Sequence, residues 1–121
     1  MQGLHLTADL RGCDSAAAVF VEPPVLRRAC LAAVRGAGLT AVGELFHRFD
    51  GGGVTGVVLL AESHVAVHTW PELGAVTLDV YVCNYSGDNS ARAAALLASL
   101  ETLFAPSSVQ RHSLQRGTLS A

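Results

Sequence analysis

Three apolar segments follow one another in residues 54–83, VTGVVLLAESHVAVHTWPELGAVTLDVYVC. The third segment alternates strictly between apolar and polar side chains, which is typical of a β-strand with one face on a core. The interruptions at Ala61-Glu62-Ser63 and at Pro71-Glu72-Leu73-Gly74 predict turns. The predicted strands cover residues 54–60, 64–70 and 75–83.

The flanking sequence adds two helices and three more strands. Leu4 to Arg11 alternates like a half-buried strand, and Gly51-Gly52-Gly53 supplies a flexible turn after another. Apolar residues recur at helical spacing in two places, one starting at Pro23-Pro24 and one capped by Asp88, Asn89 or Ser90. The additional elements are strands at 4–11, 40–49 and 108–115, a helix at about 23–36, and a second helix that starts at its cap in residues 88–90 and is ended by Pro106, with a frayed tail after residue 115.

This element order predicts one α+β domain, a two-layer sandwich of a mostly antiparallel sheet with helices on one face. The other sheet face then needs a partner. The simplest partner is a second copy of the chain, packed sheet against sheet in a homodimer.

Composition excludes several classes of protein. The chain has 121 residues, enough for one core, and only 15% of them are charged, with a net charge of −2. Disorder, nucleic-acid binding and a membrane-spanning helix are therefore not expected. All eight basic residues are arginines, so the chain cannot use a lysine Schiff base with pyridoxal phosphate or a P-loop lysine.

The three cysteines, Cys13, Cys30 and Cys83, are widely separated and form no CxxC pair. This usage argues against a disulfide framework and a zinc ribbon. The first residues also contain no apolar signal segment. We expect a cytoplasmic protein.

Polar residues gather within the most apolar part of the chain, and three mechanisms could use them. Cys83 and His68 could form a thiolate pair for nucleophilic catalysis. His64, His68 and Glu72 could bind a metal, although two histidines four residues apart on a strand are widely separated. Ser63 could instead attack the carbonyl of Glu62, so that the peptide becomes an ester and elimination cuts the chain. That third route leaves a pyruvoyl group, an electrophilic ketone that needs no lysine.

The third mechanism coincides with a resemblance. The run Glu62-Ser63-His64-Val65-Ala66-Val67-His68-Thr69-Trp70-Pro71-Glu72, followed by Asp79-Val80-Tyr81-Val82-Cys83, resembles the prokaryotic S-adenosylmethionine decarboxylase proenzymes. Gly3-Leu4-His5-Leu6, Gly12-Cys13-Asp14 and Phe46-His47-Arg48-Phe49 extend the similarity over nearly all of residues 3–105. These proenzymes are pyruvoyl enzymes of polyamine synthesis.

The resemblance implies cleavage between Glu62 and Ser63, giving a β chain of residues 1–62 and an α chain of residues 63–121. Ser63 would become the pyruvoyl group that forms a Schiff base with S-adenosylmethionine, with no pyridoxal phosphate and no metal. His68 would be the processing base and Cys83 the proton donor after carbon dioxide leaves. The product would serve spermidine synthesis, and the cleaved protomers would form a homodimer.

For substrate binding, the resemblance places Phe49 on the adenine ring and Glu72 on the ribose hydroxyls. Thr55 stands where many relatives have a serine that assists processing. Val82 and Asn84 flank Cys83 where threonine and glycine are common, so we expect an altered turn after that strand.

Ser63 and His68 are five residues apart, and strict alternation puts them on opposite sheet faces. We therefore expect a turn or bulge between Ser63 and Val65 that lets both serve one site on the polar face of Cys83. Two other functions stay open. The same fold could decarboxylate arginine or ornithine, or the chain could be an unprocessed relative without catalysis.

Overall fold

The computed structural model describes residues 2–85 and 87–117, which build a six-stranded sheet in the order β2-β3-β4-β5-β1-β6. Every neighbouring pair of strands is antiparallel. The strands are β1 (Gly3–Arg11), β2 (Ala41–Arg48), β3 (Val54–Leu60), β4 (Ser63–Trp70), β5 (Ala75–Cys83) and β6 (Ser108–Arg116). The helices are α1 (Ala18–Val21), α2 (Pro23–Gly36), the 3₁₀ turn η1 (Pro71–Leu73) and α3 (Ser90–Phe104).

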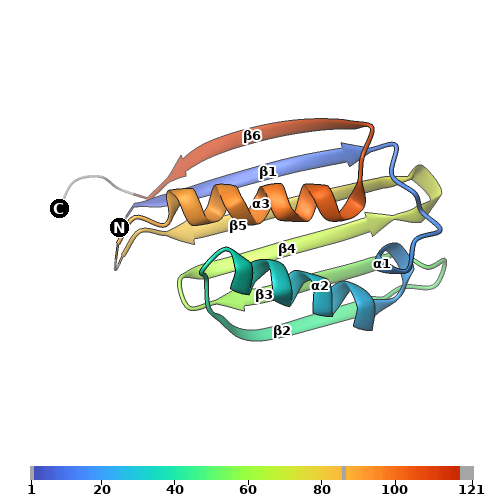
Figure 1. The fold of residues 1–121 in the computed structure, drawn as a ribbon, viewed down its shortest axis with the longest axis horizontal. Helices are drawn as coiled ribbons and strands as arrows, with labels where there is room; N and C mark the ends of the chain where they lie inside the picture. Colours follow the sequence, from blue (N-terminus) through green and yellow to red (C-terminus); the bar gives the residue numbers. More distant parts are fainter. Residues whose placement is uncertain (1, 86, 118–121) are drawn as a thin grey trace.

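The predicted α+β sandwich is confirmed. Figure 1 shows α2 and α3 over the same face of the sheet, with α3 across β1 and β5 and α2 across β2 and β3. The strand at the C-terminal edge is also confirmed, because β6 pairs with β1 along its whole length. Most of the predicted frayed tail, residues 118–121, lies outside the described residues.

The core lies between the helices and the sheet. α2 starts with Pro23 and Pro24, and it buries Leu26, Cys30 and Val34, which recur at intervals of four residues along one helix face. α3 buries Leu96 and Leu100 against β1 and β5. Each such leucine contributes about 1.5–3 kcal/mol through removal of apolar surface from water. The two helices are therefore held by the face that the sequence pattern predicted.

Alternation along the strands divides the sheet into two faces. In β5, Val76, Leu78, Val80 and Val82 are buried under the helices, whereas the residues between them lie on the opposite face. We call this opposite side the open face, because no helix or strand of the described chain covers it. It carries polar side chains at its centre and exposed apolar side chains at Leu45, Leu59, Trp70 and Leu114.

The turn after β5 does not need the glycine that is common in the resembling proteins. Among described non-glycine residues, only Ser63 and Ala105 have positive φ values, so Asn84 has an ordinary backbone conformation. The Asn84 side-chain oxygen accepts a hydrogen bond of 2.9 Å from the backbone N–H of Asn89. Its own backbone N–H donates to the carbonyl of Gln2 at 2.8 Å. Asn84 thus holds the loop through one side-chain contact that glycine could not make and one backbone contact that glycine would keep.

Candidate active site

The two-residue turn Ala61-Glu62 joins β3 to β4, and Ser63 is the first residue after it. Ser63 pairs with Leu60 on one side and with Val82 on the other. Its φ of 116° lies in a region that residues with side chains rarely adopt and that costs about 1–3 kcal/mol. Strand pairing on both sides holds the serine in this conformation. The backbone strain is thus located at the predicted cleavage position.

The carbonyl of Glu62, which Ser63 would attack, is held by a hydrogen bond. The backbone N–H of Cys83 donates to this carbonyl oxygen at 3.1 Å. A fixed donor polarises the carbonyl and stabilises negative charge that develops on its oxygen during nucleophilic attack. Glu62, Ser63 and Cys83 therefore form a compact group, which we call the Ser63 cluster.

The remaining predicted residues line a cleft of about 580 Å³ beside the other end of β4. Phe49, Thr55, His68 and Glu72 all contribute to its wall, and we call these four residues the His68 cluster. Thr55 and His68 are direct cross-strand neighbours, and the Thr55 hydroxyl lies 3.0 Å from Nδ1 of the imidazole. In the tautomer in which Nδ1–H donates to Thr55, Nε2 carries the lone pair that can accept a proton. Thr55 thus orients a candidate base.

The glycine turn presents Phe49 at the mouth of this cleft. The N–H of Phe49 donates to the carbonyl of Gly53 at 2.8 Å, and Gly52 donates back to Phe49 at 3.0 Å. A Cβ on Gly53 would lie 2.8 Å from the backbone oxygen of Thr69, so no larger residue fits there without movement. The Phe49 ring is half-exposed and meets the edge of His47 at a centroid distance of 4.6 Å. It is therefore available to a planar ligand.

The structure does not bring the Ser63 cluster and the His68 cluster together within one chain. Ser63 and His68 are five residues apart on β4, or about 16 Å at strand spacing. Thr77 on β5 is the strand partner of His68, and Cys83 lies six residues further along β5. Cys83 is therefore about 20 Å from His68 along the strand direction. The expected convergence of these residues is not found within one chain, because they occupy opposite ends of the same strands.

The predicted bulge after Ser63 is also absent from the described strands. Pairing is continuous from Ser63 to His68 with β3 and from Ser63 to Trp70 with β5. His68 therefore lies on the open face, whereas Ser63, with its positive φ, shares the phase of the helix-facing residues. The same separation removes the Cys83–His68 thiolate pair from consideration within one chain.

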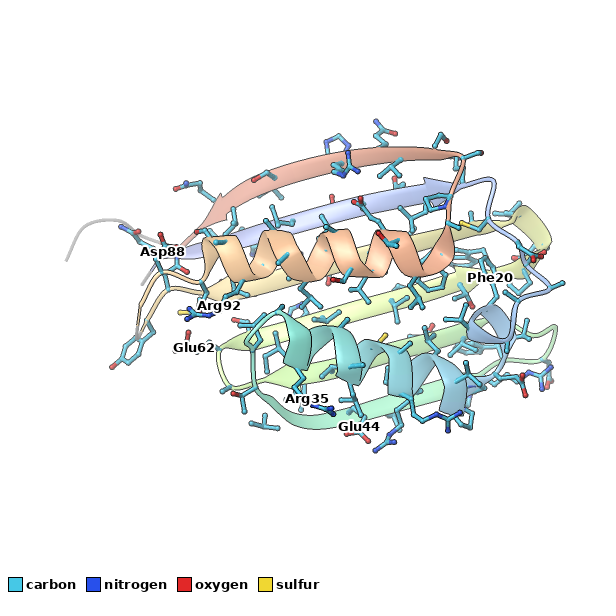
Figure 2. All side chains as sticks on the ribbon, in the orientation of Figure 1. Phe20, Arg35, Glu44, Glu62, Asp88 and Arg92 are labelled. Carbon is cyan, nitrogen blue, oxygen red and sulfur yellow. The ribbon has the colours of Figure 1, made fainter. Side chains whose placement is uncertain are left out.

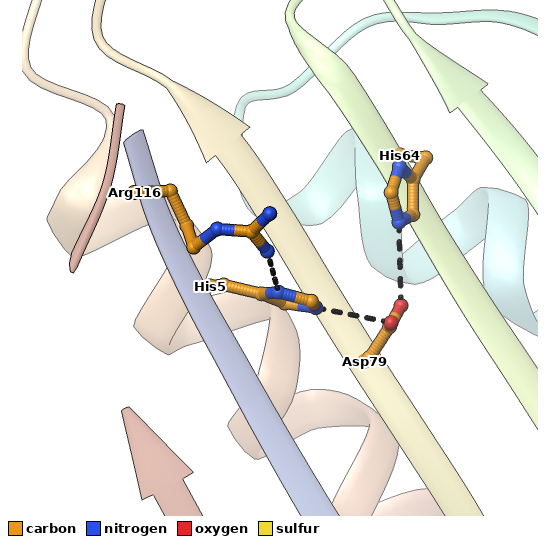
Figure 3. A network of polar contacts seen from close by, with 4 residues as sticks. All are labelled: His5, His64, Asp79 and Arg116. Atoms are coloured by element: carbon orange, nitrogen blue, oxygen red, sulfur yellow. Dashed lines mark hydrogen bonds and ion pairs between the residues drawn. The ribbon is translucent and has the colours of Figure 1, made fainter. Parts of the chain in front are cut away.

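Between the two clusters, the open face carries a network of polar side chains (Figure 3). Nε2 of His5 lies 3.0 Å from Oδ2 of Asp79, and Nε2 of His64 lies 3.5 Å from Oδ1. Arg116 lies 3.0 Å from Nδ1 of His5. Because arginine can only donate, Nδ1 accepts and the neutral His5 ring carries its proton on Nε2, aimed at Asp79.

The polar network also contains the residue types that could bind a metal ion. Within the described chain, His5, His64 and Asp79 are the group of ligand-type residues whose donor atoms lie within 4.8 Å of one another. The hydrogen bond from Arg116 occupies the Nδ1 lone pair and keeps a proton on Nε2, so His5 offers no free nitrogen for a metal. His64 and His68 are about 13 Å apart along β4, so the combination with Glu72 cannot hold one ion within a chain.

Two cysteines are separate from the site. Cys30 is buried under α2, and burial raises its pKa from 9.0 to about 12, so it is a neutral core residue. Burial also raises the pKa of Cys13. Neither thiol has the electropositive surroundings that activate a cysteine.

Sequence reasoning missed two residues at the site. Trp70 stacks on His68 at a centroid distance of 6.4 Å and lines the cleft, and its place two residues after His68 on one strand face was the available signal. Asn89 donates to Glu62 and to the Cys83 carbonyl, and the only signal for it in the sequence was its preference for a helix cap.

The S-adenosylmethionine decarboxylase family model matches residues 4–117. An S-adenosylmethionine decarboxylase proenzyme from Archaeoglobus fulgidus is 41% identical over 115 residues, which are 95% of this chain and 97% of that protein. The proenzyme from Aquifex aeolicus is 48% identical over 81 residues, which are 67% of this chain and 58% of that protein.

The structural comparison agrees. The crystal structure of the adenosylmethionine decarboxylase from Aquifex aeolicus superposes with a TM-score of 0.87 at 36% identity, covering 98% of this chain and 92% of that one. Within the described residues, no helix is long and apolar enough to cross a membrane. Sequence, fold and motif agree, and this chain belongs to the S-adenosylmethionine decarboxylase family.

Proposed function

We propose that this chain is a self-cleaving S-adenosylmethionine decarboxylase proenzyme that is cut between Glu62 and Ser63. The observation that carries the proposal is the Ser63 cluster, in which a strained serine follows a carbonyl held by the Cys83 N–H at 3.1 Å. Cleavage would give chains of residues 1–62 and 63–121 that stay together as one domain, because β3 and β4 remain paired after the cut.

Self-cleavage on these residues proceeds in balanced steps. Ser63 Oγ attacks the Glu62 carbonyl carbon, its proton leaves to a base, and the Cys83 N–H stabilises the resulting oxyanion. The C–N bond then breaks, the nitrogen takes a proton, and an ester remains. Removal of the Ser63 α-proton expels the Glu62 carboxylate, and hydrolysis of the new enamine by water releases ammonia and leaves a pyruvoyl group. Relief of the Ser63 backbone strain favours this direction.

The pyruvoyl group supplies an electron sink for the carbon that loses carbon dioxide. The chain's own side chains would hold and protonate the substrate. Phe49 offers a half-exposed ring for the adenine, and Glu72 on η1 offers an anionic acceptor for the ribose hydroxyls. Cys83 would return a proton to the α-carbon, a task for which a thiol with a transferable proton is suitable.

The active site would be completed by a second copy of the chain. A two-fold axis that lies between two open faces and runs across their strands would bring the end of the sheet that carries Ser63 and Cys83 in one protomer toward the His68 cluster of its partner, twice, with Cys83 on the open face. The exposed apolar residues of the open face, Leu45, Leu59, Trp70 and Leu114, favour such a contact. The separation of about 16 Å within one chain is the reason that a dimer is needed.

The product, decarboxylated S-adenosylmethionine, would donate aminopropyl groups in spermidine synthesis. The cytoplasmic location, which rests on cysteine usage, stays a prediction. Phe49 and Glu72 favour an adenosine-containing substrate over arginine or ornithine, since neither amino acid has a base or a ribose for them to hold.

The proposal is tested by assaying purified protein for release of carbon dioxide from S-adenosylmethionine, arginine and ornithine side by side. We expect turnover of S-adenosylmethionine alone, and loss of both cleavage and turnover in Ser63→Ala. Cleaved protein that decarboxylates arginine or ornithine instead would overturn the substrate assignment.

A further inference from the structure

The Asn89 side chain connects two members of the Ser63 cluster, Glu62 and Cys83. The residue precedes α3 and is only 6% exposed. Its side-chain Nδ2 donates to the Glu62 carboxylate and, at 3.0 Å, to the backbone carbonyl of Cys83. Its Oδ1 accepts from Nη1 of Arg92 at 3.1 Å. Figure 2 shows Glu62 and Arg92 close together at this end of the molecule.

The orientation of the Asn89 amide follows from its partners. A carboxylate and a carbonyl can only accept hydrogen bonds, whereas an arginine can only donate. The nitrogen must therefore face Glu62 and Cys83, and the oxygen must face Arg92. No other orientation satisfies all three partners, and aspartate and leucine lack the two donors that this position uses.

These bonds close a ring around the scissile peptide. The side chain of Glu62 is bound by Asn89, Asn89 is bound to the Cys83 carbonyl, and the Cys83 N–H donates to the Glu62 carbonyl. The ring fixes the Glu62 main chain from both its carbonyl and its side chain. The ring also holds both backbone polar groups of Cys83, its N–H and its carbonyl, in hydrogen bonds.

Asn89 does not use its side chain to cap the helix. The Asn89 side chain makes no capping hydrogen bond with a backbone N–H in the first turn of α3, whereas Asp88 accepts from the N–H of Ser90 at 2.9 Å. The helix start and the ring around Glu62 are therefore served by different neighbouring residues. This separation allows a substitution at one without the same loss at the other.

We infer that Asn89 is a positioning residue for self-cleavage, which holds the Glu62 carbonyl in place for attack by Ser63. The inference rests on the proposed function, since it concerns the same reaction. Asn89 touches no reacting atom and acts through the side chain of Glu62 and the backbone of Cys83. Displacement of a reacting group by about 1 Å can slow a reaction about 100-fold, so loss of this ring should slow cleavage strongly.

The test follows cleavage of newly made chain over time in a cell-free synthesis, with the full chain and its two fragments separated on a denaturing gel. Asn89→Asp keeps the side-chain shape and an oxygen that can accept from Arg92, but replaces both donors with a carboxylate that repels Glu62. We expect cleavage about 10–100-fold slower than in the parent chain. Asp88→Ala is the matched control, because it weakens the same helix start without touching the ring, and its cleavage rate should stay within about twofold.

A compensating variant separates positioning from structure. In the double variant Asn89→Asp with Glu62→Gln, the new glutamine amide can donate to the new aspartate, which reverses the polarity of the lost hydrogen bond. We expect this double variant to cleave at least about fivefold faster than Asn89→Asp alone. The Glu62→Gln single variant completes the double-mutant cycle.

Three results would overturn the inference. The first is an Asn89→Asp chain that is cleaved at the parent rate. The second is a double variant that is cleaved no faster than Asn89→Asp alone, although both proteins melt at the parent temperature. Asp88→Ala could also slow cleavage as much as Asn89→Asp, which would assign the effect to the helix start. A parent chain that stays uncut would instead overturn the proposed self-cleavage, and the inference with it.

Discussion

A chain carrying Cys83→Ala, paired with a chain carrying Glu72→Ala, should rebuild one working site per dimer. Within one chain, Ser63 and Cys83 lie about 16–20 Å from His68 and its neighbours, farther than side chains can bridge. If each site takes the Ser63 cluster from one protomer and the His68 cluster from the other, the mixed dimer has one intact site and one doubly damaged site.

The expected activity follows from that count of sites. The mixed dimer, isolated through two different affinity tags, should show about half of the parent activity on S-adenosylmethionine. Each parental homodimer should be at least about 100-fold less active, because one lacks its proton donor and the other its ribose contact. The Cys83→Ala chain keeps its backbone N–H, so cleavage should continue in it, and a gel checks that both chains are cut.

The reciprocal pairing is the decisive control. Both substitutions in one chain, paired with a parent chain, leave every composite site with one damaged half, so this dimer should be nearly inactive. If each site instead belonged to one chain, the same dimer would keep about half of the parent activity. If the mixed dimer of the two single variants is no more active than the homodimers, and the reciprocal dimer keeps half of the activity, each site lies within one chain.

Three further predictions concern single positions. Thr55→Val removes the hydroxyl 3.0 Å from Nδ1 of His68 and should slow cleavage about tenfold in a time course, whereas Thr55→Ser should cleave at least as fast as the parent. Ala105→Gly relieves the positive φ of 46° after α3 and should raise the stability of uncleaved Ser63→Ala protein by about 1 kcal/mol in urea titration; no gain would contradict the left-handed cap. Because burial raises the pKa of Cys30 to about 12, its neutral thiol stabilises the fold fully below pH 9, and this contribution is lost between pH 9 and 12. Cys30→Val should flatten the fall in unfolding free energy across that window, and an unchanged slope would count against a buried neutral thiol.

The strands and helices were largely predictable because their hydrophobic periods are clean. Val76 to Val82 alternate without interruption, and both long helices bury the stripe that their spacing predicts. The edge strand β6 was predictable from weak alternation, although its partner β1 was not, because pairing between residues about 100 apart leaves no local signal. The short helix α1 escaped detection since four residues are too few to show a period.

The arrangement of the candidate site was not predictable from the sequence. The motif around Ser63 indicated candidate side chains, and their roles stay predictions. Five strand residues place His68 far from Ser63 in the same chain. Sequence spacing alone predicted a local bulge, whereas the strand pairing is regular and the site is divided between two ends of the sheet. Asn89 was out of reach, because its side chain bonds to partners that only the folded turn brings near.

The most direct test of self-cleavage is the intact mass of the purified protein under denaturing conditions. The account predicts two chains that break between Glu62 and Ser63, with the second chain lacking a free amino terminus and lighter by ammonia loss than simple hydrolysis would leave it. Ser63→Ala should give one uncut chain. A parent protein that stays a single full-length chain, or a second chain that begins with an unmodified serine, would contradict the formation of a pyruvoyl group at Ser63.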